Sequence, residues 1–341
     1  MLGMLPCRKA LSFRKSRYQS LHGGGKKMKR IVCLIFAFVI AFSLFSCSFT
    51  DDSVRNDKIK IVATLFPQYD FARTVAGDRA QVELLLPLGT DSHSFDPSMK
   101  DAAKLSDADI FIYTGEVMEN WALPFAENAP DSCIILDVSK NIEPICLDDE
   151  HDLDNESEAH NHSHSVNVDP HIWTSPENAA IIVNDILESL CFIDPENSDY
   201  YIQNATEYTE KLLQLDADFA ECVENARLDT LYFGGKFAFR YFAQHYGIKC
   251  VTLYDSCSES SEPDPATVTS MVKAIKDDKV KVVLYPELSD DRSAESIAEG
   301  TGAHTALFHS CHNLSKNEFE SGKTYLSIMY ENLEVLREAL S

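Results

Sequence analysis

Short apolar runs alternate with amphipathic stretches over most of the chain, which is typical of alternating strands and helices. The intervening stretches begin with Pro or acidic residues and several end at Gly, which are helix boundary signals. Strands that alternate with short helices predict parallel sheets covered by helices. The predicted strands are 59–66, 81–87, 108–115, 133–139, 230–235, 248–255, 280–287 and 304–310.

A long helical region separates the first four predicted strands from the last four. Residues 194–227 contain no Gly, and no Pro after Pro195, so we predict one helix there. Roughly thirty helical residues span about 45 Å, which is long enough to reach both groups of strands. We therefore predict an α/β protein with two βα lobes, each with a parallel four-stranded sheet, joined by a long backbone helix. The predicted divisions are an N-terminal lobe at 59–147, a His- and acid-rich loop at 148–168, a crossing helix at 169–193, the backbone helix at 194–227 and a C-terminal lobe at 228–341.

The N-terminus has the pattern of an export signal. A basic cluster precedes the apolar residues 31–46, a stretch shorter than the ~20 residues that a membrane span needs. The following Cys47 completes a "LFSC" sequence similar to a bacterial lipobox, so we expect Cys47 to be lipidated and the chain to lie outside the cytoplasm, anchored to the membrane. An uncleaved membrane anchor is the alternative. We interpret Met28 as the true start, which gives an upstream stretch at 1–27, a signal peptide at 28–46 and a tether at 47–58.

The charge of the chain excludes some partners. The chain has 30 Lys and Arg against 54 Asp and Glu, a net charge of −24. Nine of the basic residues precede Cys47, so 21 basic and 54 acidic residues remain after it. Such an acidic protein would repel the phosphates of a nucleic acid and would attract cations. No H-E-x-x-H or G-x-S-x-G motif occurs, so we expect no enzyme, with a metallohydrolase as the rival interpretation.

Ligand-type side chains follow several of the predicted strands. His93 comes after the second strand, and Glu287 ends the seventh, with Asp290 and Asp291 close behind. His171 stands where the chain crosses between the lobes. In open α/β sheets, ligands bind beyond the carboxyl ends of the strands. Two imidazoles and a carboxylate form a donor set for a divalent transition metal, zinc above all.

Four stretches carry a resemblance to a known family. They are "LLLPLGTDSHSFDPSMKDAAKLSDADIFIYTG", "DPHIWTSPENAA", "GGKFAFRYFAQHYGI" and "GKTYLSIMYENLEVLREAL". With them, residues 59–340 resemble the zinc- and manganese-binding (ZnuA-like) solute-binding lipoproteins of ABC transporters. The resemblance implies one metal ion, Zn²⁺ or alternatively Mn²⁺, held between the lobes by His93, His171 and Glu287 (or Asp290 or Asp291). It also implies delivery of the ion to a membrane permease, and we expect a monomer.

Lys236 departs from the pattern of this family. The resemblance implies a third ligand, His or Glu, ahead of the aromatic "AFRYF" stretch, where this chain has Lys236. A protonated lysine has no lone pair for a metal. We therefore expect Lys236 to turn away or to pair with a nearby carboxylate outside the coordination sphere. The metal would then keep three protein ligands and water, or take an imidazole from the 148–168 loop.

The remaining histidines after Cys47 fall into two groups, one on the acidic loop and one in the C-terminal lobe. An auxiliary set lies on the acidic loop and comprises His151, His160, His162 and His164. We expect these histidines to collect metal ions for the site; the alternative is a solvated loop without a role. His245 is assigned to a helix end packed on its neighbours. The other three flank the last predicted strand and are left out of the site, with a second site in "FHSCHN" as the alternative; they are His304, His309 and His312. A surface adhesin with a structural metal is a further alternative for the whole chain.

Overall fold

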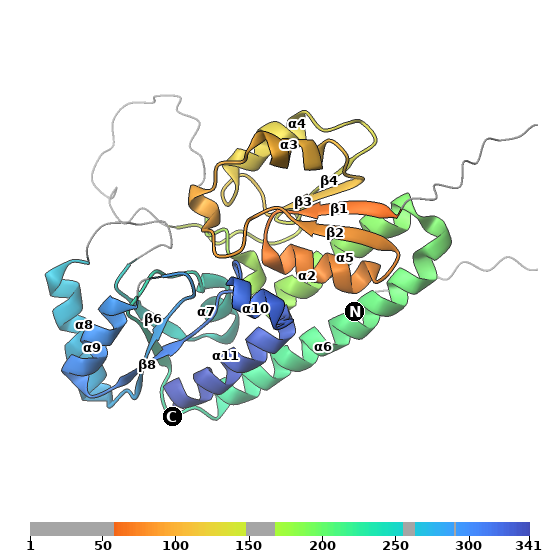
Figure 1. Cartoon of the computed structure of the whole chain (residues 1–341). Coiled ribbons are helices and arrows are strands. Elements are labelled where there is room, and N and C mark those ends of the chain that lie inside the picture. Colours follow the sequence, from red (N-terminus) through yellow and green to blue (C-terminus); the bar gives the residue numbers. More distant parts are fainter. Residues whose placement is uncertain (1–57, 148–167, 255–262, 290) are drawn as a thin grey trace, which may run out of the picture. The chain divides into compact units, whose positions relative to one another are not determined.

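The computed structural model describes residues 58–147, 168–254, 263–289 and 291–341 (Figure 1). The predicted leader with Cys47 lies outside this part, and so do Asp290 and the four histidines of the auxiliary loop. Within the described ranges, no helix combines the length and the apolar character needed to cross a membrane.

The first four strands form one parallel sheet. Its strands lie in the order β2-β1-β3-β4. In this sheet Ile61 of β1 is in register with Val82 on one side and with Ile110 on the other. The strand bounds are β1 Ile59–Ala63, β2 Ala80–Leu84, β3 Ile110–Tyr113 and β4 Ile134–Asp137.

The last four strands repeat this arrangement in the order β6-β5-β7-β8, again all parallel. The predicted fold class is therefore confirmed. In both sheets the strand order reverses beside the first strand of the lobe, and such switch points are where open α/β sheets bind ligands. The strand bounds are β5 Thr230–Phe233, β6 Lys249–Thr252, β7 Val282–Tyr285 and β8 His304–Leu307.

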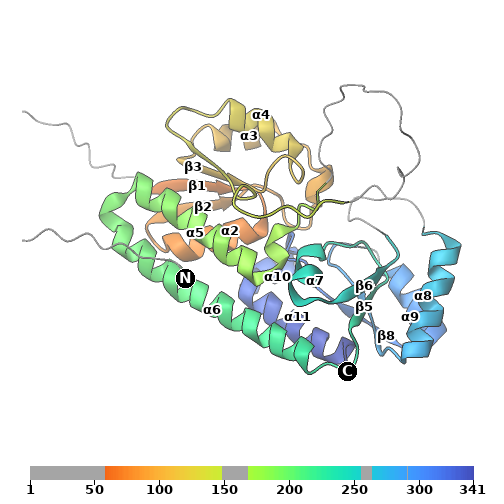
Figure 2. The same cartoon turned by 180° about the vertical axis from the view of Figure 1, so that it is seen from behind.

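Helices cover the sheets and connect the lobes (Figures 1 and 2). The α-helices are α2 Phe66–Ala76, α3 Met99–Leu105, α4 Leu123–Glu127, α5 Pro176–Ile193, α6 Ser198–Glu224, α7 Arg240–Tyr246, α8 Pro265–Asp278, α9 Arg292–Thr301, α10 Lys316–Glu320 and α11 Tyr325–Ala339. Short 3₁₀ turns are η1 Ser92–Ser94, η2 Asn120–Ala122, η3 Ile172–Thr174 and η4 Pro195–Asn197.

Helix α6 is the backbone helix that the sequence pattern predicted. Its 27 residues span about 40 Å at 1.5 Å each. One stripe of its surface is buried, with successive members three or four positions apart, as a helix facing a core requires. This stripe packs on α2 and α5 of the N-terminal half and on α11 at the C-terminus; it consists of Tyr201, Ala205, Tyr208, Leu212, Leu215 and Phe219.

The largest hydrophobic cluster in the described residues contains side chains from both lobes, and each lobe also has a smaller cluster of its own. At the centre of the largest cluster, the hydroxyl of Tyr325 in α11 donates to the carbonyl of Trp173 (2.7 Å), and the Tyr325 backbone N–H donates to Asp70 of α2 (2.8 Å). The rings of Tyr325 and Phe71 meet edge to face, with centroids 4.9 Å apart. The lobes are therefore joined by packed side chains as well as by the chain itself.

Two of the stretches that lie between predicted strands are helical over only part of their length. The stretch 236–247 becomes helical only at Arg240, because Phe237 and Phe239 both pack on Phe233, each with ring centroids 5.2 Å apart. Residues two apart on a helix point about 200° apart and would not reach one partner. In 116–129 the only α-helix is α4, where Pro124 favours a helix start.

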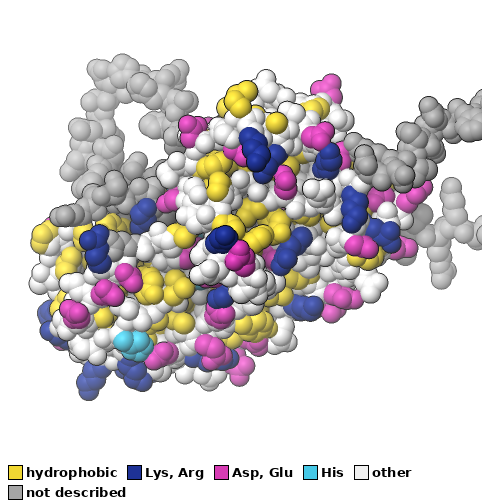
Figure 3. All heavy atoms as spheres, in the orientation of Figure 1, with side chains coloured by type: hydrophobic (Ala, Val, Ile, Leu, Met, Phe, Trp, Pro, Cys, Tyr) yellow, Lys and Arg dark blue, Asp and Glu magenta, His cyan; other side chains and the backbone are white. Residues whose placement is uncertain are grey.

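The exposed charges are mixed in sign. On the face shown in Figure 3, Lys and Arg side chains lie among Asp and Glu side chains, with small groups of hydrophobic side chains between them. This face therefore does not carry the acidic excess as one continuous patch.

Candidate metal site

His93 lies in a short 3₁₀ turn that is held by hydrogen bonds from neighbouring side chains. The turn η1 follows β2, and the carboxylate of Asp91 accepts the backbone N–H of His93 (2.9 Å), which caps the turn. The indole N–H of Trp121 donates to the carbonyl of Ser92 (3.2 Å), and Ser92 itself is buried. These bonds fix the direction in which the half-buried His93 leaves the backbone.

His171 is buried and oriented by a carboxylate. It is 2% exposed, and one oxygen of Asp169 lies 2.8 Å from its backbone nitrogen and 2.9 Å from its ring Nδ1. Arg240 contacts the other Asp169 oxygen at 3.5 Å. Although burial opposes it, the neighbouring His171 and Arg240 lower the pKa of Asp169. A carboxylate on Nδ1 fixes the tautomer in which Nε2 carries the lone pair, which is the usual support of a metal-binding histidine.

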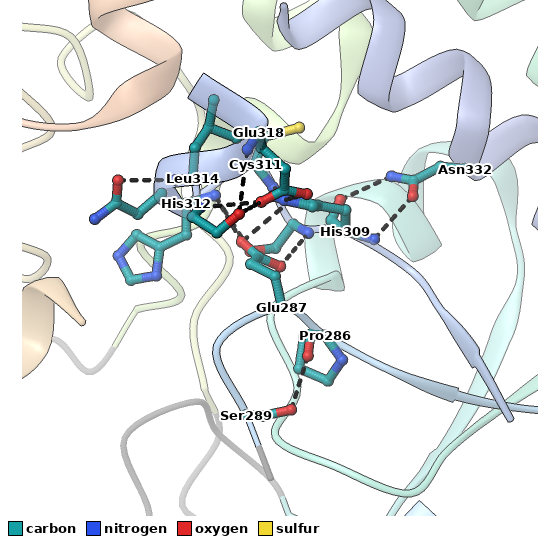
Figure 4. A network of polar contacts seen from close by, with 12 residues as sticks. Pro286, Glu287, Ser289, His309, Cys311, His312, Leu314, Glu318 and Asn332 are labelled. Carbon is teal, nitrogen blue, oxygen red and sulfur yellow. Dashed lines mark hydrogen bonds and ion pairs between the residues drawn. The ribbon is translucent and has the colours of Figure 1, made fainter. Parts of the chain in front are cut away.

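His312 follows β8 in a loop that is supported from below by Glu287 (Figure 4). One Glu287 oxygen accepts the backbone N–H of Ser310 (2.7 Å), and the other accepts the Ser310 hydroxyl (2.6 Å) and the backbone N–H of His312 (2.9 Å). Cys311 between them has a positive φ of 62°, an uncommon value for a non-glycine residue. The Glu287 bonds hold the loop in this conformation.

The three imidazoles converge. The ring centroids of His93 and His171 lie 5.7 Å apart, those of His93 and His312 lie 5.5 Å apart, and those of His171 and His312 lie 6.0 Å apart. Three imidazoles bound to one tetrahedral Zn²⁺ at 2.0–2.1 Å would have centroids about 5 Å apart. The observed triangle is within about 1 Å of that arrangement.

The triangle is not yet a coordination shell. Among the residues that the structure describes, no group of three or more His, Cys, Asp or Glu side chains is arranged to hold an ion as it stands. One reason is that Nε2 of His312 is hydrogen-bonded to the hydroxyl of Ser92. Burial, and then the neighbouring His171 and His93, lower the pKa of His312 well below its usual value, so that its ring is neutral near pH 7.

The two predicted carboxylate ligands that the structure describes, Glu287 and Asp291, have different surroundings. Both oxygens of Glu287 are occupied by the loop that carries His312, and a carboxylate offers about four lone-pair positions, of which three are used here. Asp291 lies at the start of α9, where burial and this carboxylate raise the pKa of Tyr285. Glu287 thus lies directly beneath the histidine loop, whereas Asp291 stands at the N-terminal end of α9 and its side chain makes no capping hydrogen bond there.

Lys236 pairs with a carboxylate, which is one of the two outcomes expected from its position. Its ammonium nitrogen lies 3.6 Å from Asp91, on the oxygen that does not accept the His93 N–H. Both side chains are more than one-third exposed. Lys236 therefore contacts the turn of His93 through Asp91.

Sequence reasoning left His312 out of the ligand set, and the structure places it beside the two predicted ligand histidines. A usable signal was present, because His312 follows the last strand of its sheet, at the same edge as the other candidate ligands. His245 has the structural place that was predicted, with Nε2 2.7 Å from Asp216 of α6.

Two βα lobes with convergent histidines between them define a two-lobed solute-binding protein of the metal-receptor class. The chain belongs to the ZnuA family: residues 61–339 match the family model described as zinc-uptake complex component A, periplasmic. The resemblance inferred from four sequence stretches is therefore confirmed.

Named relatives agree with this membership. The chain is 33% identical over 313 residues to the high-affinity zinc uptake system protein ZnuA of Bacillus subtilis (strain 168), covering 91% of this chain and 96% of that protein. It is 32% identical over 311 residues to the zinc-binding lipoprotein AdcA of Streptococcus pneumoniae, of whose length the match spans 61%. The crystal structure of the Zn(II)-bound ZnuA-like domain of that AdcA is similar with a TM-score of 0.69 at 29% identity, covering 83% of this chain and 99% of that domain.

Proposed function

We propose that this protein is an extracytoplasmic receptor that captures Zn²⁺ between its two lobes and delivers it to the permease of an ABC importer. The observation that carries the proposal is the approach of His93 to His171, two imidazoles from separate segments with ring centroids 5.7 Å apart. The relatives named for zinc uptake and zinc binding support the same cargo.

The donor set favours zinc over manganese. Imidazole nitrogens suit Zn²⁺, whereas Mn²⁺ prefers carboxylate, carbonyl and water oxygens. The buried Asp169 on Nδ1 of His171 raises the basicity of that ring, as such partners do in zinc sites. Glu287 is the proposed carboxylate ligand, using its remaining lone-pair position, and Mn²⁺ is the alternative cargo.

A receptor role needs no catalytic turnover, and we expect none. The parts of the proposal that lie outside the described residues are a lipid anchor at Cys47 and an ion-gathering role for His151, His160, His162 and His164. We further propose that the protein acts as a monomer. Deletion of 148–165 is expected to leave the high-affinity site intact and to remove weaker additional ions, counted by titration calorimetry.

Competition with a zinc chelator tests the proposal. Protein without its leader should bind one Zn²⁺ tightly, and His93→Ala and His171→Ala should each lower the affinity at least tenfold, since even the outer partners of metal ligands are worth about that much. His245→Ala is the matched control, because this histidine contacts Asp216 away from the site. Folded protein that ignores both zinc and manganese at micromolar concentrations would refute the receptor role.

A further inference from the structure

The loop that carries His312 is anchored within its own lobe at two points. Besides the bonds to Glu287, the side-chain oxygen of Asn332 in α11 accepts the backbone N–H of His309 (2.8 Å), and its amide donates to the His309 carbonyl (2.7 Å). Asn332 and His309 are both buried. The position of His312 is therefore set by bonds from β7 and α11 and does not depend on the N-terminal lobe alone.

The same loop is also bonded to the loop that carries His93. The side-chain amide of Asn313 donates to the carbonyls of Pro87 (2.8 Å) and Thr90 (2.9 Å), and the N–H of Gly89 donates to the carbonyl of Leu314 (2.8 Å). These bonds join residues more than 220 positions apart in the chain. These bonds hold the loop of His312 in a fixed position against the loop of His93.

Position 236 is occupied in a different way. The resemblance implies a third ligand there, but the Lys236 side chain pairs with Asp91 at 3.6 Å. Asp91 in turn caps the His93 turn. Lys236 therefore neutralises a carboxylate beside the site and leaves the third imidazole to come from elsewhere.

We propose that His312 is the third imidazole ligand of the captured Zn²⁺. The inference rests on the proposed function and names a ligand for its site. Its ring lies 5.5 Å from His93 and 6.0 Å from His171, centroid to centroid, and is buried. When Nε2 of His312 binds zinc, the Ser92 hydroxyl gives up its hydrogen bond to that nitrogen. The hydroxyl then donates to Sδ of Met118, which already lies 3.3 Å from the Ser92 oxygen.

The test compares four proteins in a chelator competition: wild type, His312→Ala, Lys236→Ala and the control His304→Ala, whose side chain is 55% exposed at the outer edge of β8. His312→Ala should bind zinc on the order of 100-fold more weakly, since a ligand is worth at least as much as its supporting partners. Lys236→Ala should change the affinity by less than about fivefold, because it removes only a partly exposed ion pair. His304→Ala should match wild type.

A direct readout separates coordination from mere packing. In histidine ¹⁵N–¹H spectra of the wild type, addition of zinc should shift the Nε2 resonance of His312 together with one nitrogen each of His93 and His171. If His312→Ala is misfolded, His312→Gln and these spectra decide the point. Unchanged zinc affinity in His312→Ala, or a His312 resonance that zinc does not move, would overturn the assignment. In that case, loss of binding in His171→Ala still supports the receptor itself, whereas wild type that binds no zinc refutes the proposed function.

Discussion

The support of His171 by Asp169 yields a sharp prediction. Asp169→Asn keeps the size and shape of the side chain but removes the negative charge that faces Nδ1 at 2.9 Å. A single Asp169 oxygen accepts both bonds from His171, and the amide oxygen of asparagine can still accept them. The ring therefore keeps an acceptor but loses the negative charge that supports it, and the amide nitrogen replaces the oxygen that faces Arg240.

The expected loss follows from the kind of contact that is removed. Partners that orient metal-binding histidines are worth about 10–100-fold in affinity, or about 1.4–2.7 kcal/mol. The upper half of this range is expected here, because Asp169 is buried and is also contacted by Arg240 at 3.5 Å. Removing its charge leaves Arg240 beside the site without that carboxylate.

The assay is competition between the protein and a chromogenic zinc chelator at constant pH and salt, with thermal melting of the metal-free protein in parallel. Asp216→Asn is the matched control, because Asp216 also accepts from a histidine, His245 (2.7 Å), and from Tyr246 (2.8 Å), but on α6. The control should lose stability and keep its zinc affinity. Asp169→Asn with zinc affinity within twofold of wild type would refute the assigned role of Asp169.

Further predictions concern pH and metal removal. Burial raises the pKa of Glu119 from 4.5 to about 7, so stability that is present below pH 4.5 is lost as the pH rises through 7. Glu119→Gln can still accept the Thr114 N–H but carries no charge. In denaturant titrations this variant should be more stable than wild type by up to about 3 kcal/mol at pH 8 and by little at pH 5. The contact with Nε2 of His309, at 3.6 Å, holds the pKa of Glu318 at about 2. The contribution of this contact to stability is present above pH 4.5 and is lost as the pH falls toward 2. Glu318→Gln should therefore be less stable at pH 7, with a flatter acid limb of the same titration. Chelation of zinc should lower the melting temperature without unfolding the protein at 25 °C, as followed by circular dichroism.

The fold was readable from the sequence because its signals are local and repeated. Each of the eight apolar runs overlaps one strand of the structure, and residues without Gly or internal Pro form α6. The errors arise where tertiary packing decides the conformation. Phe237 and Phe239 look helical in pattern, but both pack on Phe233 and delay the start of α7 to Arg240.

The site was predicted only in part. His171 directly follows an Asp-Pro pair, His93 lies three residues before another, and the structure brings their rings together. His312 carries no such neighbour. Its place depends on the positive φ of Cys311 and on the bonds that Glu287 makes to the loop, and both are properties of the folded chain. The position of His312 after the last strand is visible in the order of residues, but the φ of Cys311 and the bonds of Glu287 are not.

The contacts around the site also bear on how an ion is captured and released. The loops of the two lobes are already bonded to each other through Asn313, and Tyr325 ties α11 to the crossing segment and to α2. Opening the lobes would break these buried bonds and part of a continuous core, whereas moving the Ser92 hydroxyl from His312 to Met118 costs one hydrogen bond. Exchange of an ion is therefore expected to proceed by rearrangement of the two histidine loops, with the lobes and α6 keeping their packing. The site is close to its bound geometry before the ion arrives, which limits the free energy that binding must spend on ordering the protein.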